Sequence, residues 1–397
     1  MANIILTWEY ERDITHITRL KYLQKKLSQM GHQVYMIGAH LPGLEENENI
    51  PFLPAPRAAI ASIHKPRSVT KIGGYSDRLA ILGFNDAKTL RSLVATWDNL
   101  FELLKPQLLI CDCAPVASLA AYKHIPCIQL SDGLSLPPHH LTDFPRLRPD
   151  APPLASSQTM LQNVHIVQNQ RNKSKPPYLP AILESDYTFI THVPEFDPYL
   201  TFRNNSAVTF GPFSNLPAYS VQHERNHFFA YLDLSFPDIE ETIIGMTGLK
   251  KTGIFYLQGA SYSLQQFITQ SGHVVCEQFP ALDEILNQCA FVIHHGNIAV
   301  AEAALSAGIP QFTLPTHFDS DWISHFLVNI GVCVAMYPEF NPVTTTAIKI
   351  NAALEVEKGY KNHNLREWST LRAQHLKQKN YMTLETSLIS ACEHLLR

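Results

Sequence analysis

Short apolar segments alternate with amphipathic segments along almost the whole chain, and this alternation limits the folds that the chain can adopt. Strands are predicted over residues 4–6, 34–37, 108–111, 126–130, 187–191 and 207–210, and then over 228–234, 254–258, 274–276, 291–294 and 311–314. Between them, apolar residues recur at helical spacing, for example over residues 87–104, 262–270 and 298–307. Such a succession of strands and helices predicts an α/β fold of open parallel sheets with right-handed crossovers.

Two stretches interrupt the alternation, and the second of them indicates where the domains divide. Residues 137–180 hold many of the 27 prolines and predict a long, partly helical insertion. Residues 211–225 are polar and rich in turn formers, and the strand–helix pattern restarts after them. We therefore expect one domain over residues 1–212 and a second over 213–375. A C-terminal helix is expected over 376–397, and packing of this helix against the first domain is one arrangement that we consider.

Composition and charge exclude several classes of protein. Apolar residues make up 45% of the chain and charged residues 17%, which excludes a disordered polyelectrolyte. The formal net charge of −4 is too close to neutral for an electrostatic nucleic-acid binder. Seven scattered cysteines, without the spacing of a zinc ribbon, predict reduced thiols in a cytoplasmic protein. We find neither a signal peptide nor an apolar run of about 18 residues that could span a membrane.

The sequence after the predicted strand 291–294 has the outline of an anion site. His295, Gly296 and Asn297 stand at the turn between this strand and the next predicted helix. Backbone N–H groups and the helix dipole favour a phosphate at such a turn, and a histidine adds a donor or a positive charge. Asp319, after the following strand, can accept hydrogen bonds from sugar hydroxyls. Ordinary polar loop residues are the alternative interpretation of the same pattern.

This segment resembles the donor-binding signature of nucleotide-sugar-dependent glycosyltransferases of the UDP-glucuronosyl and macrolide type. Their signature reads His-Gly-Gly-x-Gly-Thr, then Ala-Leu-x-x-Gly-x-Pro, a strand, a proline, and an acidic residue followed by Gln. With Gly308 and Pro310 aligned to the Gly-x-Pro, the histidine falls on His295 and the acidic residue on Asp319. A bacterial branch of macrolide-transferase-like proteins is also similar in residues 7–9, 16–20, 95–97, 112–115, 136–138 and 229–232.

The resemblance implies the GT-B fold, in which two Rossmann-like parallel-sheet domains face an interdomain cleft. The first domain would bind the acceptor and the second the nucleotide sugar. The implied reaction is an inverting, metal-independent hexosyl transfer from a UDP- or dTDP-type sugar to a hydroxyl group of a small, apolar acceptor. The nucleotide sugar is a co-substrate, so no cofactor is expected, and neither nucleic acid nor a membrane is expected as a partner.

The same resemblance implies roles for two residues in the first half of the chain. His16, the last loop residue before the first predicted helix, corresponds to the general base that takes the acceptor hydroxyl proton. Asp112, after the predicted strand 108–111, corresponds to the aspartate that orients this histidine. Both residues follow strands of one predicted sheet, so contact between them is geometrically allowed. The alternatives are that His16 only packs or caps at the start of its helix, and that Asp112 only caps the helix after it.

The donor site implied by the resemblance combines three segments of the second half. The residues assigned to the nucleotide sugar are His294, His295, Gly296, Asn297, Gln278, Phe279, Asp319 and Ser320. His294 is the alternative to His295 for the phosphate contact, because a shift of one residue would exchange them. Phe279 stands where the base would bind, and its ring can stack on that base.

Both glycine-rich loops of the family are altered in this sequence. Residues 10–15 before His16 contain no glycine. In the phosphate loop Asn297, Ala299 and Val300 replace Gly, Gly and Thr, and Val300 offers no hydroxyl group. Glycines in such loops allow the backbone to approach a ligand closely. The alternative functions are therefore a catalytically inactive GT-B protein that binds or assists a protein partner, and another GT-B reaction such as nucleotide-sugar epimerisation.

Overall fold

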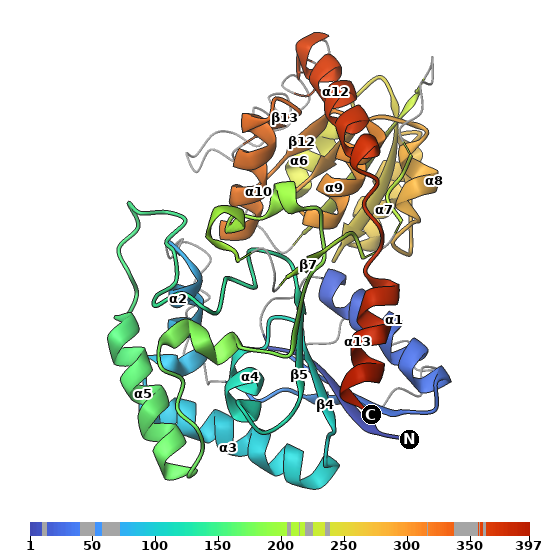
Figure 1. Ribbon diagram of the computed structural model, residues 1–397. Coiled ribbons are helices and arrows are strands. Elements are labelled where there is room, and N and C mark those ends of the chain that lie inside the picture. The colour runs from blue at the N-terminus through green and yellow to red at the C-terminus, as the bar shows by residue number, and fades with distance from the viewer. Residues whose placement is uncertain are drawn as a thin grey trace. The chain divides into compact units, whose positions relative to one another are not determined.

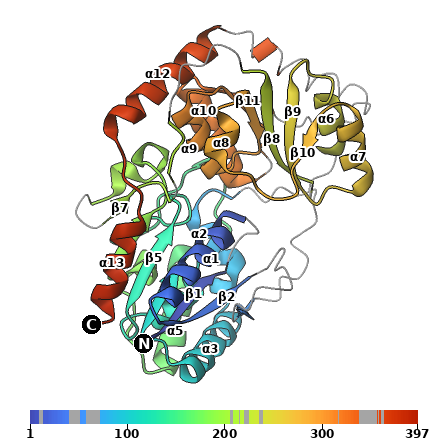
Figure 2. The same cartoon turned by 90° about the vertical axis from the view of Figure 1, so that its right-hand side faces the viewer.

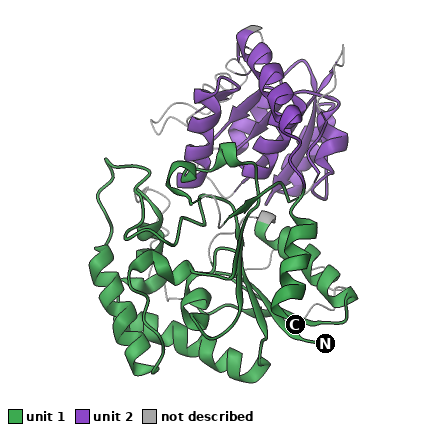
Figure 3. Ribbon diagram, viewed as in Figure 1, with its two compact units in different colours: residues 1–213, 383–397 green, residues 214–382 purple. Residues whose placement is uncertain are grey.

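The computed structural model of the 397-residue chain consists of two compact units (Figure 1; Figure 3). The first unit comprises residues 1–213 and 383–397, and the second comprises residues 214–382. The structure describes residues 1–9, 14–39, 52–57, 72–204, 208–213, 215–218, 225–234, 239–315, 317–336, 356, 358–359 and 363–397. None of the described helices has the length and apolar character needed to cross a membrane.

Seven described parallel strands form the sheet of the first unit, in the order β3-β2-β1-β4-β5-β6-β7. The strands are β1 (Asn3–Trp8), β2 (Gln33–Gly38), β3 (Phe52–Pro54), β4 (Leu108–Cys111), β5 (Cys127–Ser131), β6 (Tyr187–Ile190) and β7 (Thr209–Phe210). From β1 the chain adds β2 and β3 on one side, and then β4 to β7 on the other. The strand order thus reverses between β1 and β4, and open parallel sheets bind ligands outside the carboxyl ends of the strands at such a point.

Helices cover both faces of this sheet (Figure 2). They are α1 (Ile14–Gln29), α2 (Tyr75–Leu79), α3 (Ala87–Leu104), α4 (Pro115–Ala121), α5 (Ser157–Gln170) and α13 (Glu385–Leu395), with the short turns η1 (Ala80–Phe84), η2 (Leu179–Leu183), η3 (Pro194–Phe196) and η4 (Leu200–Phe202). Successive residues of β1 point to opposite faces. Ile4 and Leu6 belong to the core that contains residues of α1 and α13, whereas Ile5 belongs to the core with α3, α4 and α5.

The second unit repeats this architecture with six described parallel strands, in the order β10-β9-β8-β11-β12-β13. The strands are β8 (His227–Asp233), β9 (Thr252–Gln258), β10 (Val274–Val275), β11 (Cys289–His294), β12 (Gln311–Thr313) and β13 (Cys333–Ala335). The helices are α6 (Ile239–Met246), α7 (Tyr262–Gln270), α8 (Leu282–Leu286), α9 (Ile298–Ala307), α10 (Phe318–Asn329) and α12 (His363–Lys379). Here the strand order reverses between β8 and β11, so the loops after these strands form the corresponding ligand position.

The predicted fold class is confirmed, because both units are α/β structures with parallel sheets. Helices α3, α7 and α9 and strand β4 have the predicted bounds. The sequence does not predict β3 and β13, which contain three residues each. Predictions for residues 10–13, for most of 41–75, and for 207 and 343–355 concern positions outside the described residues.

The chain returns to the first unit later than the sequence predicts. The predicted boundary between residues 375 and 376 falls inside α12, which belongs entirely to the second unit. Residues from 383 onward belong to the first unit, where the Leu384 N–H donates to the Pro212 carbonyl at 3.2 Å. Leu388 of α13 is fully buried in the same core as Ile4. The last helix is therefore part of the first unit.

Candidate functional site

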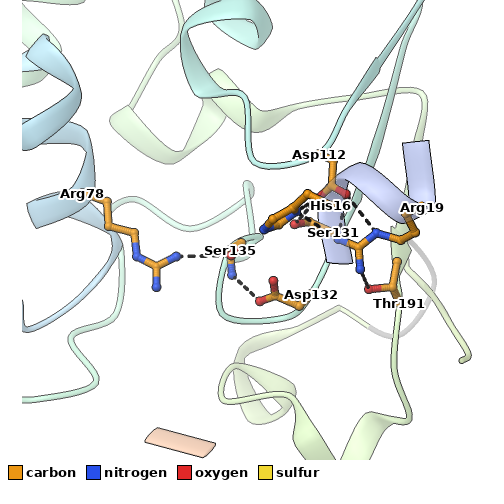
Figure 4. A network of polar contacts seen from close by, with 8 residues as sticks. All are labelled: His16, Arg19, Arg78, Asp112, Ser131, Asp132, Ser135 and Thr191. Carbon is orange, nitrogen blue, oxygen red and sulfur yellow. Dashed lines mark hydrogen bonds and ion pairs between the residues drawn. The ribbon is translucent and has the colours of Figure 1, made fainter. Parts of the chain in front are cut away.

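Side chains from α1 and from the end of β4 meet where the strand order of the first unit reverses (Figure 4). His16 and Arg19 lie three residues apart in α1, so they face the same side of that helix. Asp112 directly follows β4, and its N–H donates to the Thr7 carbonyl of β1 at 2.8 Å. His16 Nδ1 lies 2.7 Å from Asp112 Oδ1, and both side chains are buried. The contact between His16 and Asp112 that the sequence allows is thus present.

Four donors surround the Asp112 carboxylate. Oδ1 accepts from His16 Nδ1 at 2.7 Å and from Ser131 Oγ at 2.8 Å. Oδ2 accepts from Nε and Nη2 of Arg19, at 2.9 and 2.7 Å. Burial by itself raises the pKa of Asp112, but the Arg19 guanidinium and then His16 outweigh burial and lower this pKa to about 2. Asp112 is therefore ionised at neutral pH.

The contacts of the His16 ring identify which nitrogen carries its hydrogen. Nδ1 lies 2.7 Å from the ionised Asp112 and 3.0 Å from Arg19 Nη2. A lone pair on Nδ1 would face a carboxylate oxygen at hydrogen-bond distance, which is repulsive, so Nδ1 carries the hydrogen and donates it to Asp112. In the neutral ring the lone pair is then on Nε2. A histidine in this tautomer can accept a proton at Nε2 while Asp112 holds its other nitrogen.

The loop after β5 is fixed against residues that follow β6. His192 is fully buried, and its Nε2 accepts from the Gly133 N–H at 2.7 Å while its Nδ1 lies 2.8 Å from the Val193 carbonyl. Burial lowers the pKa of His192, so the ring is neutral and donates from Nδ1. Arg203 forms an ion pair with Asp197 and donates to the Leu136 carbonyl at 2.8 Å. These bonds support the backbone around Ser131, which contacts Asp112.

A second buried carboxyl group, Glu9, lies at the end of β1. Its oxygens accept from Trp97 Nε1 at 2.6 Å and from the N–H groups of Val116 and Ala117 at 2.7 and 2.9 Å. Burial raises the pKa of Glu9 to about 7, although these three hydrogen bonds act in the opposite direction. Glu9 therefore ties β1 to α3 and to the start of α4, next to the loop that carries Asp112.

In the second unit, His294 and His295 have different environments. His294 is fully buried, its Nδ1 accepts from the Gly296 N–H at 3.1 Å, and its Nε2 lies 3.0 Å from Gln311 Oε1. Burial lowers the pKa of His294 to about 3, so the ring is neutral. Both ring nitrogens of His294 thus have described partners, one in the loop after β11 and one in β12. His295 Nδ1 accepts from the Asp233 N–H at 3.4 Å, so the neutral ring carries its hydrogen on Nε2, as a phosphate donor requires. His295 therefore fits a phosphate contact better than His294.

The loop after β11 packs tightly against the start of α10. Gly296 has a φ of +84°, and a Cβ atom there would lie 2.4 Å from the Ser320 carbonyl oxygen, so only glycine fits. Asn297 caps α9, because its side chain accepts from the Val300 N–H at 3.1 Å. Ser320 forms a capping box with His317, and Asp319 lies in the first turn of α10, where the helix dipole favours its charge. Asn297 and Ser320 thus have local structural roles in addition to any ligand contact.

Aromatic side chains gather at the carboxyl ends of the strands of the second unit. Gln278 and Phe279 are exposed in the loop after β10. The Phe279 ring lies 5.4 Å from the Tyr231 ring and 5.3 Å from the Tyr256 ring, both edge to face. The Tyr231 ring also lies 5.3 Å from the His295 ring. The structure therefore brings Phe279 and His295 together around Tyr231, which the sequence does not single out.

Solved structures with the same architecture decide the fold family. The calicheamicin glycosyltransferase CalG4 has a TM-score of 0.66 at 12% identity, and the match covers 100% of this chain and 98% of that chain. The spinosyn rhamnosyltransferase SpnG, complexed with thymidine diphosphate, has a TM-score of 0.64 at 14% identity over 99% of this chain and 100% of that chain. The glycosyltransferase VinC, in complex with dTDP, has a TM-score of 0.56 at 11% identity over the full length of both chains. This chain has the GT-B fold.

These matches confirm that the chain has the fold of the macrolide glycosyltransferases that its sequence resembles. No protein-family model and no curated protein matches the sequence. The described part of the chain contains no group of three or more His, Cys, Asp or Glu side chains that could hold a metal ion.

Three residues of the site in the first unit are not predicted from the sequence. Arg19 binds Asp112, and Ser131 and Thr191 complete the hydrogen bonds of Asp112 and Arg19. The one signal for Arg19 is its position three residues after His16, on the same helix face. Ser131 and Thr191 reach the site only because β5 and β6 follow β4 in the sheet.

Proposed function

We propose that the chain is an inverting glycosyltransferase that moves a hexosyl group from a UDP- or dTDP-type sugar to a hydroxyl group of a small, apolar acceptor. The observation that carries this proposal is the buried pair of His16 and Asp112, at 2.7 Å, beside the point where the strand order reverses. The GT-B fold and its antibiotic glycosyltransferase neighbours support the reaction class. We place the reaction in the cytoplasm, where the chain's thiols stay reduced.

In the proposed reaction His16 is the general base and Asp112 is its positioning residue. His16 Nε2 takes the proton of the acceptor hydroxyl as its oxygen attacks the anomeric carbon. The bond from that carbon to the nucleoside diphosphate breaks on the opposite face, so the configuration inverts. Asp112 accepts from His16 Nδ1 throughout and stabilises the imidazolium ion that forms. This step requires no metal ion and no cofactor.

The proposed donor site lies in the second unit, at the carboxyl ends of its strands. His295 Nε2 and the start of α9 would contact the diphosphate, and Phe279 would stack on the base. Gly296 and Asn297 form the phosphate loop, Gln278 would contact the base, and Asp319 with Ser320 would face the sugar. Two structures of similar fold are complexes with thymidine diphosphate, which supports a nucleoside diphosphate as the leaving group.

The donor loop also favours a second candidate, a GT-B protein that binds a partner without catalysis. Val300, at the position of the family's threonine, is fully buried and offers no hydroxyl group to a phosphate. The Asn297 side chain already caps α9. Either feature weakens a diphosphate site at this helix, so nucleotide binding separates the two candidates.

A panel of nucleotides tests the donor site. The chain is heated with UDP, dTDP and GDP in turn, and the midpoint of thermal unfolding is measured. A ligand at 100 times its dissociation constant adds about 2.7 kcal/mol to the stability. We expect one uridine or thymidine nucleotide to stabilise the wild type, and His295→Ala to remove most of that effect. Stability that no nucleotide changes would contradict the enzyme proposal and favour the binding protein.

The matching sugar nucleotide then separates transfer from epimerisation. Release of the free nucleoside diphosphate, measured by mass spectrometry, is the result that we expect of a transferase. Conversion of the sugar to its epimer with the nucleotide still attached would instead identify an epimerase.

A further inference from the structure

Three ionisable side chains, those of Asp112, His16 and Arg19, are buried in contact with one another. Their exposed fractions are 0% for Asp112, 2% for His16 and 6% for Arg19. Arg19 donates twice to Asp112 Oδ2, and its Nη2 also lies 3.0 Å from His16 Nδ1. Its Nη1 donates to Thr191 Oγ1 at 2.9 Å, which fixes the guanidinium in this position. The guanidinium thus contacts both members of the pair that carries the proposed function.

The number of charges in this group decides whether His16 is protonated. Asp112 and Arg19 carry opposite charges and together leave the group neutral while the imidazole is neutral. A proton on His16 would add an uncompensated positive charge in a buried place, which is unfavourable. Without Arg19, the same proton would instead neutralise a buried carboxylate and would be favoured. A general base must begin the reaction neutral, so this difference determines whether His16 can act at neutral pH.

We propose that Arg19 is a positioning residue that supplies the counter-charge of Asp112 and thereby keeps His16 neutral, with the lone pair on Nε2, at neutral pH. The catalytic meaning of this inference rests on the proposed function. The charge and tautomer of His16, however, are properties of the free protein and need no substrate to be measured.

Several other described titratable groups near these strand ends have hydrogen bonds to different partners, among them Arg78, which donates to Ser135 Oγ at 3.2 Å. Glu9 binds Trp97 and the start of α4. Asp132 accepts from the Ser135 N–H at 2.9 Å (Figure 4), and His192 binds Gly133 and Val193 in a neutral ring. Ser131 and Thr191, which contact Asp112 and Arg19, carry no charge. Among the described residues that contact His16, Asp112 and Arg19 are the two that carry a charge, so their removal should change the titration of His16.

Nitrogen NMR of histidine gives the direct test. The chain is labelled with 15N in its histidines, and the His16 signals are assigned by their loss in His16→Gln. In the wild type we expect a neutral ring at pH 7 with the hydrogen on Nδ1. In Arg19→Gln we expect the titration midpoint of His16 to rise by at least about one pH unit, because an opposing charge has been removed. Arg19→Lys keeps that charge and should leave the midpoint near the wild-type value.

A second pair of variants covers the case in which Arg19→Gln does not fold. Asp112→Asn and the double variant Arg19→Gln/Asp112→Asn both lack the buried carboxylate, and the double variant contains no unpaired charge. We expect His16 to titrate at least about one pH unit higher in the double variant than in Asp112→Asn. The inference would be overturned if the His16 midpoint were the same in the wild type and Arg19→Gln, and also the same in Asp112→Asn and the double variant.

The same variants show which proposal has failed if a result is negative. If no sugar nucleotide reacts but the NMR midpoints shift as expected, the proposed function is contradicted and the charge role of Arg19 is not. If the wild type is active, the acid limb of its pH–rate profile should move to higher pH in Arg19→Gln by the same amount as the NMR midpoint. A purely structural role would lower the rate at every pH without moving that limb.

Discussion

Asp112 is the residue on which the site in the first unit depends. Its two oxygens accept from His16, Ser131 and Arg19, which come from one helix and one neighbouring strand. Removal of either partner of a buried ion pair strongly destabilises the folded protein, because the remaining charge is then buried without compensation. The pair of Asp112 and Arg19 is therefore a stability element as well as a catalytic support.

The first residue-scale prediction concerns the stability of Asp112→Asn against pH. The folded pKa of about 2 lies below the ordinary value of 3.8, so the ionised carboxylate stabilises the fold above about pH 4 and this contribution is lost as pH falls to about 2. We expect Asp112→Asn to lower the free energy of unfolding by roughly 3–5 kcal/mol at pH 7. The difference from wild type should shrink by roughly 2 kcal/mol between pH 4 and pH 2.

Urea unfolding at several pH values measures this difference. Asp150→Asn, at an exposed position, is the matched control and should follow the wild type within about 0.5 kcal/mol. A gap between Asp112→Asn and the wild type that stays constant down to pH 2 would contradict the assigned charge of Asp112.

At the scale of residues, the sequence predicts the pair of His16 and Asp112 but not the side chains that contact this pair. His16 and Asp112 follow predicted strands of one sheet, which is enough to predict that they can meet. Arg19 is one of several basic residues in α1, and only its spacing of three from His16 distinguishes it from Lys21 or Lys25. Its partners lie 93 and 172 residues away, and only the assembled sheet brings them together.

The sequence predicts best the helices whose ends are marked by a capping residue. Helix α3 begins after Asp86, whose side chain accepts from the Thr89 N–H, and α9 is followed by Gly308, which adopts the left-handed conformation. Strands β3 and β13, which the sequence does not predict, contain three residues each, but length is not the reason, because β12 is equally short and is predicted. Each forms at the edge of its sheet by pairing with one neighbouring strand, β2 for β3 and β12 for β13, and the sequence of the short strand does not reveal this pairing.

The loop between β11 and α9 provides the prediction at the scale of elements. Gly296 and Gly272 have nearly the same φ, +84° and +86°, and both lie in the second unit. A Cβ atom on Gly272 meets nothing within 4 Å, whereas on Gly296 it would lie 2.4 Å from the Ser320 carbonyl oxygen. Gly272→Ala should cost about 1–2 kcal/mol through backbone strain alone. Gly296→Ala should cost at least about 2 kcal/mol more, because backbone atoms must move.

Thermal unfolding of the two variants, side by side, measures this difference. Equal losses of stability would show that the loop after β11 does not pack against the start of α10. They would also remove the geometric reason for a glycine at the proposed phosphate loop.

For the whole molecule, the alternation of strands and helices is sufficient to predict two α/β domains with parallel sheets. It does not predict where the chain leaves the second unit, because α12 and α13 are both amphipathic and carry no signal for the unit on which they pack. The burial of Leu384, Leu388 and Cys392 in the core with Ile4 assigns α13 to the first unit. The first unit is thus completed by a segment distant in sequence.

Truncation of a side chain in α13 tests this assignment. Leu388→Ala should lower the stability of the first unit by about 2–5 kcal/mol, because it leaves a cavity in a filled core. Hydrogen exchange followed by mass spectrometry should then become faster in β1 and α1, with little change in β8 and β11. Leu371→Ala, at a side chain that is 47% exposed on α12, is the control and should change neither region. Faster exchange confined to the second unit in Leu388→Ala would contradict the assignment of α13.

The measurement that tests the central claim most directly is the rate of glycosyl transfer by His16→Ala, with the donor identified by the nucleotide panel. A general base contributes about 100- to 10,000-fold, so we expect the rate to fall by at least about 100-fold. His375→Ala, at an exposed histidine of α12, should retain the wild-type rate. Stabilisation by the nucleotide should be unchanged in His16→Ala, because the proposed donor site lies in the other unit. A His16→Ala variant that binds nucleotide and transfers sugar at the wild-type rate would contradict the account.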